Sequence, residues 1–497
     1  MDLWIAGFSQ IFQLTPMLLI AIGVAIGIIF GAIPGMSATM AVALFLPITF
    51  GMEPIPSIAL LVALFIGGIS GGLITAILIN IPGTPASIAS TFDGFPMAQN
   101  GQAGRALGIA ILYSFIGTLM GCLVLFFVAP PVARFALRFG SFEYFAISLF
   151  ALTLVAGLSG DNLAKGLVSA LIGLLVAMIG VAPIDAYKRF TFEFSQLDAG
   201  LALVPVLLGL FAVSEVLKEA ETSFGNNVTK LPKFNMPGFF GTNWKGIKGQ
   251  SPNMVRSGAI GIGIGLLPGI GAGTSNLLAY LAAKNSSKTP EKFGTGIPDG
   301  IIASETSNNA GIGAAMVPLI TLGIPGDSVT AMLLGGFLIH GIQPGPLLFQ
   351  NNGELVYSIF VALLVSSVVM LCLLYFGLRG FAAMLSIPKH YLLSLVMVMC
   401  FVGAFAVNNR IFDVFTLIAF GVLGYAMLKF RFPFPPLILG FILGPMLEQN
   451  LRSALMSTKG SILPFFERPI TAFFLSLAVL YVIIVTARKL KGWKTRT

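Results

Sequence analysis

Charged side chains are scarce in this sequence. Only 9% of its 497 residues are Asp, Glu, Lys or Arg, whereas 56% are hydrophobic and the mean hydropathy is +0.95. A soluble domain carries about 25% charged residues, so the composition predicts an integral membrane protein. The net charge of +9 comes from short loops and the C-terminus. This placement indicates the cytoplasmic lipid leaflet, and not nucleic acid, as the partner of the basic residues.

Cysteine and histidine are also rare. Cys122, Cys372 and Cys400 lie inside apolar runs without CxxC spacing, and His340 and His390 are far apart in the sequence. We therefore expect no disulfide framework, no metal site and no cofactor. A nucleophile paired with a base is not evident, so an intramembrane hydrolase or transferase is a less favoured alternative and the chain is expected not to be an enzyme.

Long uncharged runs are present, and their breaks are the most informative feature of the chain. Residues 257–283 carry no charge, yet GIGIGLLPGIGAGTSN, from Gly261 to Asn276, occupies the middle of this run. An unpaired backbone group in hydrocarbon costs several kcal/mol, so membrane-length runs normally stay helical. A Pro-Gly break beside Ser, Thr and Asn therefore predicts polar backbone that faces a cavity.

The break occurs twice at one offset. Pro268 follows Pro34 by 234 positions (268 − 34), and Gly27, Gly31 and Gly35 fall on glycines at the same offset. A second pair matches Asn80–Pro85, NIPGTP, with Gly323–Ser328, GIPGDS, at an offset of 243 (325 − 82). The extra residues of the second copy fit the polar stretch 284–299. Paired broken segments in two halves point to a midplane substrate site in a repeat-built transporter.

The expected fold is an all-α polytopic membrane protein with two structural repeats that contain broken helices or re-entrant hairpins. Apolar length predicts about 11 to 14 membrane elements, including segments over 166–184 and 435–447. We divide the chain into a first membrane half (1–217), a cytoplasmic basic linker (218–256) and a second membrane half with C-terminal helices (257–497). The basic tail after the last helix predicts a cytoplasmic C-terminus.

Small polar residues and backbone at the breaks are the candidate substrate-binding groups, because helix N-termini attract carboxylates. The equally open alternative for each Ser or Thr is that it only satisfies backbone or packs between helices. The substrate-binding candidates are Pro34, Gly35, Ser37, Thr39, Asn80, Pro82, Gly83, Thr84, Arg105, Pro268, Gly269, Gly271, Thr274, Ser275 and Asn276.

A second group offers oxygen ligands for a hard cation or a group for proton coupling. Its members are Ser304, Glu305, Thr306, Asn308, Asn309, Pro325, Gly326, Asp327 and Ser328. Glu305 and Asp327 are the strongest of these because a buried acid is expensive and usually functional. Asp93 and Asp299 are interpreted as loop residues at the membrane surface. Arg105 either meets a substrate carboxylate or is a positive-inside anchor, the more usual role.

These motifs resemble those of the large membrane subunit of the tripartite tricarboxylate transporters. The resemblance covers much of both repeat cores, whereas the chain beyond about residue 355 is similar only as generic membrane helices. The segments that carry it are GAIPGMSATMAVALFLPITFGMEP (31–54), NIPGTPASIASTFDGFPMAQNGQAGRALG (80–108), GLLPGIGAGTSN (265–276) and SETSNNAGIGAAMVPLITLGIPGDSVTAMLLGGFLIHGIQPGP (304–346).

The resemblance implies a secondary-active importer of the bacterial inner membrane, driven by Na⁺ or H⁺, that carries a tricarboxylate or dicarboxylate. It also implies a small membrane subunit and a periplasmic carboxylate-binding protein as partners. A passive anion channel or facilitator is the alternative that the residues themselves leave open.

Overall fold

The computed structural model describes the chain apart from residues 1, 159–161, 223–233, 236–237, 387–388 and 495–497. Within that part the chain is almost entirely helical and holds one two-stranded sheet. Short or irregular helical segments are labelled η. The first half contains α1 (Asp2–Ile11), α2 (Leu14–Ala32), α3 (Ala38–Phe45), η1 (Pro47–Gly51), α4 (Pro54–Ile79), η2 (Pro85–Ser87), α5 (Ile88–Met97), η3 (Ala98–Gln102), α6 (Ala103–Ala136), α7 (Ser141–Leu158), α8 (Leu163–Ala177), β1 (Gly180–Val181), β2 (Lys188–Arg189), η4 (Ser195–Leu197), α9 (Leu203–Leu208), η5 (Gly209–Val213) and α10 (Ser214–Thr222).

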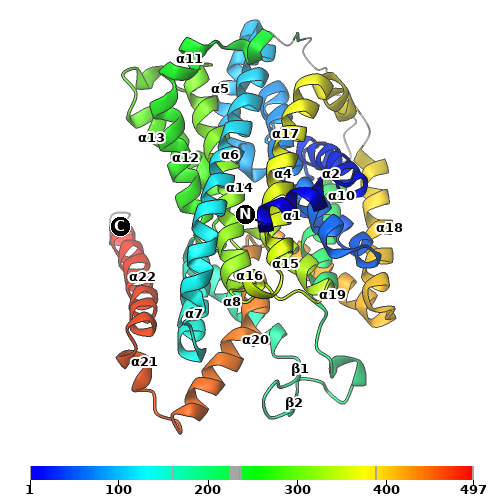
Figure 1. Cartoon of the computed structure of the whole chain (residues 1–497), viewed down its shortest axis with the longest axis vertical. Coiled ribbons are helices and arrows are strands. Elements are labelled where there is room, and N and C mark those ends of the chain that lie inside the picture. Colours follow the sequence, from blue (N-terminus) through cyan, green and yellow to red (C-terminus); the bar gives the residue numbers. More distant parts are fainter. Residues whose placement is uncertain (1, 159–161, 223–233, 236–237, 387–388, 495–497) are drawn as a thin grey trace.

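The second half follows the same plan and adds further helices. It contains η6 (Gly238–Gly241), α11 (Trp244–Gly249), α12 (Ser251–Gly265), α13 (Ala272–Asn285), η7 (Pro290–Lys292), α14 (Pro298–Leu322), α15 (Ser328–Ile339), α16 (Leu348–Asn351), α17 (Gly353–Ala383), η8 (Met384–Ser386), α18 (Lys389–Asn408), α19 (Ile411–Lys429), α20 (Phe434–Ser457), α21 (Pro464–Glu467) and α22 (Pro469–Lys494). Helices α4, α6, α14 and α17 stand upright through the centre of the molecule (Figure 1). We call the end with the strands the hairpin end, and the opposite end, with α11, the linker end.

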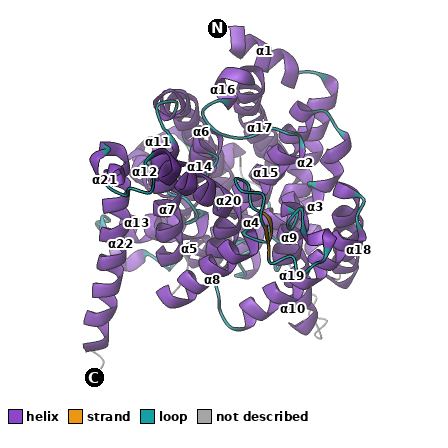
Figure 2. Ribbon diagram, turned by 90° about the horizontal axis from the view of Figure 1, so that it is seen from below, coloured by secondary structure: helices purple, strands orange, loops and turns teal. Residues whose placement is uncertain are grey.

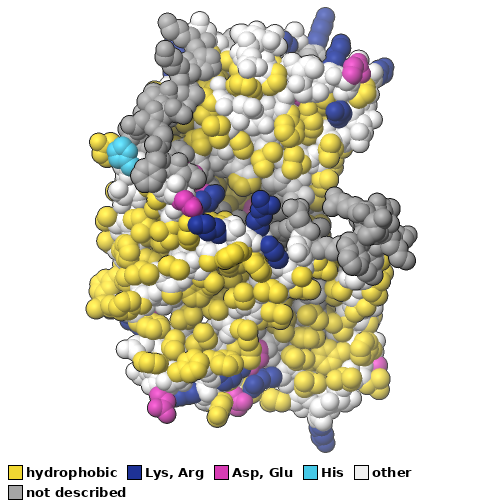
Figure 3. Space-filling view, turned by 180° about the vertical axis from the view of Figure 1, so that it is seen from behind, with side chains coloured by type: hydrophobic (Ala, Val, Ile, Leu, Met, Phe, Trp, Pro, Cys, Tyr) yellow, Lys and Arg dark blue, Asp and Glu magenta, His cyan; other side chains and the backbone are white. Residues whose placement is uncertain are grey.

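The surface agrees with a membrane environment. Seven helices of the described chain are long and apolar enough to cross a membrane, and four further apolar helices are shorter. Large apolar side chains face outward, for example Phe376 at 82% and Phe127 at 74% exposure. Figure 3 shows hydrophobic side chains over much of one face, with Lys and Arg gathered in patches. The chain is therefore a multi-pass, all-α membrane protein, as the composition predicts.

Glycines set the distance between the two long helices of each repeat. A Cβ on Gly31 of α2 would lie 2.1 Å from the carbonyl oxygen of Gly68 in α4, so only glycine permits this approach. In the second half, Gly265 of α12 would place its Cβ 2.8 Å from Ala314 and Gly311 of α14. The residue numbers rise together along each pair, so α2 is parallel to α4 and α12 is parallel to α14.

The two repeats have opposite orientations. Helix α5 runs parallel to α4, since Gly72 meets Ser87 and Ile77 meets Gly94. It runs antiparallel to α14, where Ser90 bonds Ser304 but the later residue Asp93 meets the earlier residue Gly300. Therefore α4 and α14 are antiparallel, and the repeats are inverted. The α2–α3 pair and the α12–α13 pair therefore enter from opposite ends, and α12 and α13 lie toward the linker end (Figure 1).

Equivalent backbone devices build the breaks in both halves. Asn80 ends α4 and Gly323 ends α14 in the left-handed conformation, with φ of 58° and 72°. Gly35 and Gly269, which follow the matched prolines, have φ of 90° and 74°. A residue in the left-handed conformation ends a helix and lets the following N–H groups bond its last carbonyl groups. Both halves use such residues at equivalent places.

Two predicted segments have different bounds. The segment expected over 166–184 ends as a helix at Ala177, because Gly180 adopts φ of 116° and begins the short antiparallel sheet of β1 and β2. Seen from the hairpin end, the strands lie near the middle of the bundle (Figure 2). Helix α20 continues beyond the expected 435–447 to Ser457, because charged residues such as Arg452 extend it past its apolar part.

Candidate functional site

The four breaks meet at one place. The backbone N–H of Gly269 donates to the carbonyl of Gly326 at 2.7 Å. Gly83 lies against the carbonyl of Gly31, where a Cβ would approach to 2.0 Å. The sequence predicted four separate polar tips, and the fold brings their backbones into contact in pairs. We call this meeting point the tip cluster: residues 33–37, 80–87, 266–271 and 323–328.

Side chains join the halves across the tip cluster. Thr39 donates to the hydroxyl of Ser328 at 3.4 Å, and Asn276 donates through Nδ2 to the carbonyl of Ala86. Four helical segments begin here, namely α3, η2 with α5, α13 and α15. Their first N–H groups lack partners within the helix, and their dipoles present positive ends to the same region. The arrangement can hold an anion.

The start of α15 is the acidic part of the cluster. Asp327 is its N-cap, and Oδ1 accepts from the Thr330 N–H at 2.7 Å and from the Thr330 hydroxyl at 2.8 Å. Asp327 also lines a small pocket between breaks three and four, which is too narrow to hold a water molecule. The pocket is lined by Gly265, Gly271, Ala272, Ser275, Gly311, Ala315, Gly326 and Asp327. A carboxylate at this position is an oxygen ligand of the kind that a hard cation prefers.

The start of η2 is the neutral counterpart. The backbone N–H of Thr84 donates to the Ser87 hydroxyl at 3.3 Å, as the N–H of Asp327 donates to the Thr330 hydroxyl at 2.8 Å at the equivalent positions. The Thr84 side chain is 3% exposed, and its Oγ1 has no hydrogen-bond partner among the described residues. The hydroxyl is therefore available to a ligand.

A polar face of α14 continues from the cluster toward the linker end. Residues 304–309 are all buried at 0 or 1% exposure. Ser307 donates to the carbonyl of Ser275 at 3.0 Å, which ties α14 to α13. Thr306 Oγ1 and both amide atoms of Asn308 have no partner in the described chain. An unpaired buried amide costs about 1–3 kcal/mol, so Asn308 is a strong candidate for contact with a transported species.

Glu305 has a cage of neutral hydrogen-bonding groups. Its Oε1 accepts from Ser90 at 2.5 Å and its Oε2 from Ser114 at 2.9 Å. Asn309 donates to the same carboxyl at 3.4 Å and accepts from Ser70 at 2.8 Å. Sequence reasoning missed Ser70, Ser90 and Ser114, because isolated serines in apolar helices carry no signal of their direction.

Other predicted residues lie in different surroundings. Ser37 caps α3 by accepting from the Met40 N–H at 3.1 Å, and Ser275 donates to the carbonyl of Ala272. Arg105 is exposed at the start of α6 and bonds the carbonyl of Gly241 at 3.3 Å and Gln102 at 3.0 Å. The structure therefore does not bring Arg105 to the tip cluster. Asn80 is exposed and serves as the left-handed cap of α4.

Two acidic residues that are not among the candidates, Asp93 and Glu219, make close contacts inside the protein. Asp93, expected at the membrane surface, is fully buried and accepts from Tyr280 and from the N–H groups of Gly294, Gly296 and Ile297. The expectation was wrong because the polar loop 294–297 folds over the carboxylate. Glu219 of α10 lies against Gly35, where a Cβ would come within 2.2 Å of its carboxylate. The sequence did not predict this contact, because Glu219 lies in a charged segment far from the motifs.

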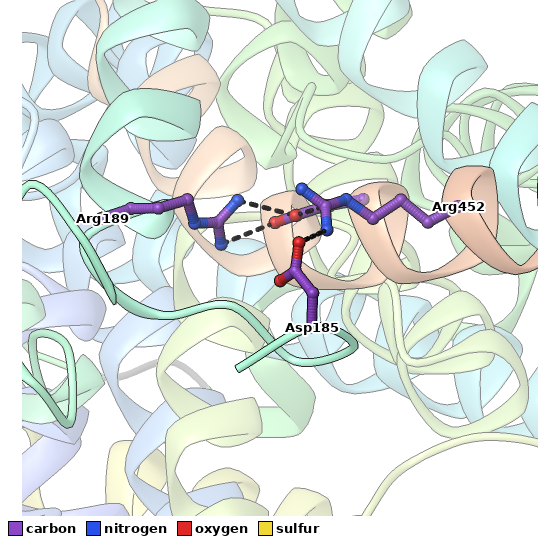
Figure 4. Close-up of polar contacts among 4 residues, drawn as sticks. Asp185, Arg189 and Arg452 are labelled. Carbon is purple, nitrogen blue, oxygen red and sulfur yellow. Dashed lines mark hydrogen bonds and ion pairs between the residues drawn. The ribbon is translucent and has the colours of Figure 1, made fainter. Parts of the chain in front are cut away.

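A larger cavity of about 530 Å³ opens near the hairpin end, between the strand region and α20. Arg189 on its wall makes a two-pronged contact with Glu448 at 2.6 and 3.0 Å, and Arg452 bonds both Glu448 and Asp185 (Figure 4). The Arg452 guanidinium lowers the pKa of Asp185 chiefly by its hydrogen bond. All these charges are paired, in contrast to the carboxyl of Glu305.

Comparison with known proteins gives the family. Residues 17–439 match the tripartite tricarboxylate transporter TctA family. The chain belongs to this family. An uncharacterised 52.8 kDa protein of the TAR-I ttuC' 3' region of Agrobacterium vitis is 34% identical over 93% of this chain and 91% of its own length. No solved structure matches.

A second relative covers part of the chain. An uncharacterised protein of the TAR-II ttuC' 3' region of Agrobacterium vitis is 36% identical over 44% of this chain and 91% of its own length. Membership makes the chain a transporter subunit and not an enzyme, within a tripartite system that has other subunits.

Proposed function

We propose that this chain forms the translocation path for secondary-active, cation-coupled uptake of organic di- or tricarboxylates. The observation that carries the proposal is the meeting of four helix breaks from two inverted repeats at one buried polar cluster. Transporters with inverted repeats bind substrate and coupling ion at such discontinuous helices, near the membrane midplane.

The tip cluster has complementary parts for an anion and a cation. The starts of α3, η2, α13 and α15 supply N–H groups, and Thr84 supplies a buried hydroxyl without a partner; Asn308, on the polar run of α14, supplies an unpartnered amide. These groups would bind carboxylate oxygens. Asp327 supplies a negative charge at the start of α15. An anion beside that carboxylate would be repelled unless a cation entered with it, which favours coupled transport.

The proposed orientation puts the linker end in the cytoplasm of a bacterial cell, across its inner membrane. Basic residues gather in short connections at this end: Lys245 and Lys248 of α11 are exposed, as are Lys288 and Lys292 between α13 and α14. An excess of basic residues marks the cytoplasmic side. The C-terminus would then be cytoplasmic, and a periplasmic binding protein would deliver substrate at the hairpin end. A small membrane subunit completes the proposed complex.

The decisive test is uptake of labelled di- and tricarboxylates by proteoliposomes that hold this chain with the small membrane subunit. Uptake is measured with and without the binding protein, and under separate Na⁺ and proton gradients. Concentrative uptake that requires the binding protein and one gradient supports the proposal. Downhill flux without dependence on either gradient would instead identify a passive channel or facilitator.

A further inference from the structure

Glu305 lies where both repeats contribute to one cage. The residue is on α14 of the second repeat and is 1% exposed. Ser90 of α5 and Ser114 of α6 bond its two oxygens directly, and Ser70 of α4 reaches it through Asn309. Three helices of the first repeat therefore hold one carboxyl of the second. A change at this carboxyl would act on the contact between the repeats.

No cationic side chain in the described part of the chain pairs with Glu305. The titratable side chains on the elements packed against α14 are Asp93 on α5, Arg105, Tyr113, Cys122 and Arg134 on α6, Arg256 on α12, Tyr280 and Lys284 on α13, and Asp299 on α14 itself. None of these forms a hydrogen bond or ion pair with Glu305 in the described chain; Asp93, for example, bonds Tyr280 and the 294–297 loop. Helix α4 carries no titratable side chain. An ionised carboxylate buried without a positive partner is strongly disfavoured.

The cage satisfies both protonation states. With a proton on Oε1, the carboxyl donates to Ser90, and Ser90 donates to Ser304 at 2.7 Å. Without that proton, Ser304 donates to Ser90 and Ser90 donates to the carboxylate. Only two hydroxyl hydrogens rotate between these states, and Ser114 donates to Oε2 in both. Gain and loss of a proton therefore need no repacking of the core.

The geometry suits a proton better than a metal cation. A hard cation takes about six oxygen ligands around a site of its own. Here the serines contact the carboxyl oxygens directly, at 2.5 and 2.9 Å, and the Asn309 amide nitrogen points its hydrogens at the same carboxyl. Those hydrogens would repel a cation at this position.

We infer that Glu305 is the proton-binding residue of a proton–carboxylate symporter. The inference rests on the proposed function and names its coupling ion. One proton from the substrate-entry side joins the Glu305 carboxylate to give the neutral acid, and the same proton leaves on the other side. The neutral form removes the buried charge. The contact between the repeats around Glu305 therefore stays stable while substrate and proton are carried across.

Glu305→Gln tests the inference, because glutamine keeps the shape of the neutral acid and cannot release a proton. The complete complex in proteoliposomes is assayed for uptake driven by an inside-alkaline pH gradient and for exchange of labelled against unlabelled substrate. We expect pH-gradient-driven accumulation to fall by about tenfold or more, while exchange stays within about twofold and becomes independent of pH. Glu448→Gln, which changes a carboxyl paired with arginines, should retain gradient-driven accumulation.

The outcomes separate two failures. Accumulation by Glu305→Gln under the pH gradient, or accumulation by the unchanged chain under a Na⁺ gradient alone, would overturn the assignment. Absence of concentrative uptake by the unchanged chain would instead overturn the proposed function. If Glu305→Gln does not assemble, Glu305→Asp serves in its place. That variant keeps a titratable group and should retain coupling with a displaced pH profile of accumulation.

Discussion

The long helices α4 and α14 occupy equivalent places in the two repeats but have opposite chemistry. At the offset of 243, the polar run 304–309, SETSNN, corresponds to 61–66, LVALFI, and both runs are buried. Glu305 stands where the first repeat has Val62, and Asn308 where it has Phe65. The backbone of the repeat is thus set by glycines and caps that both halves share. The transport chemistry that we propose is concentrated in the second half, where six polar side chains are kept inside a membrane protein at considerable cost.

The largest expected effect tests the shared backbone. Gly31→Ala should lower the free energy of unfolding by about 3 kcal/mol, because its Cβ would meet the backbone of α4 at 2.1 Å and neither helix can yield. Gly265→Ala should cost less, about 1–2 kcal/mol, since its neighbours begin at 2.8 Å. Thermal unfolding of the purified protein in detergent measures both.

Gly263 of α12 is the matched control for these variants. A Cβ there has nothing within 4 Å, so Gly263→Ala should be neutral or gain up to about 1 kcal/mol of helix propensity. Equal losses for Gly31→Ala and Gly263→Ala would contradict the account of close packing between the paired helices.

The next prediction concerns the chemical difference between α4 and α14. An apolar residue placed in the polar run of α14 makes the second repeat resemble the first. Asn308→Leu should leave stability unchanged or raise it by about 1 kcal/mol, since a buried amide without partners is removed. Uptake should fall by about tenfold or more if the amide contacts a transported species.

Asn309→Leu is the control variant, because the amide atoms of Asn309 are hydrogen-bonded. It should lower the free energy of unfolding by about 2 kcal/mol, because Ser70 and Glu305 lose a partner. Unfolding and uptake measured together separate the two roles; unimpaired uptake by Asn308→Leu would exclude its proposed contact.

A smaller effect on stability comes from the caps. Asp327→Asn should change the free energy of unfolding by only about 0.5 kcal/mol, since asparagine is an equally good N-cap and Thr330 can still donate to its carbonyl oxygen. The cation dependence of uptake should nevertheless change, because the negative charge at the start of α15 is gone. Thr84→Ala removes the neutral hydroxyl at the equivalent position of the first repeat and should leave the cation dependence as it was. Unaltered cation dependence in Asp327→Asn would show that this carboxylate is only a cap.

The smallest effect is expected outside the repeats, where acids are paired with arginines. Arg452 lowers the pKa of Asp185, so the stability from this pair is complete above the ordinary aspartate pKa of about 4 and is lost as pH falls through the lower folded value. Asp185→Asn should therefore lower the unfolding temperature slightly near pH 7, and the difference from the unchanged chain should shrink as the pH falls below about 4. A difference that grows on acidification would reverse the assigned sign.

The sequence by itself determined the membrane class, the two repeats, the four breaks and the polar run of α14. Each depends on local chemistry: proline and glycine interrupt helices wherever they occur, and a run of six polar residues inside an apolar chain is visible without a fold. The matched left-handed positions at Asn80 and Gly323 follow from the same local chemistry.

Only the tertiary structure decided that the repeats are inverted, that Arg105 lies away from the tip cluster and that Asp93 is covered by a loop. It also selected Ser70, Ser90 and Ser114 as the partners of the Glu305 cage. These serines come from segments 191 to 239 positions away from their partners on α14. The direction of a lone serine on an apolar helix depends on how that helix packs, and the packing is fixed by contacts between distant glycines. The sequence therefore supplied the buried acid, and the packing of the two repeats decided what surrounds it.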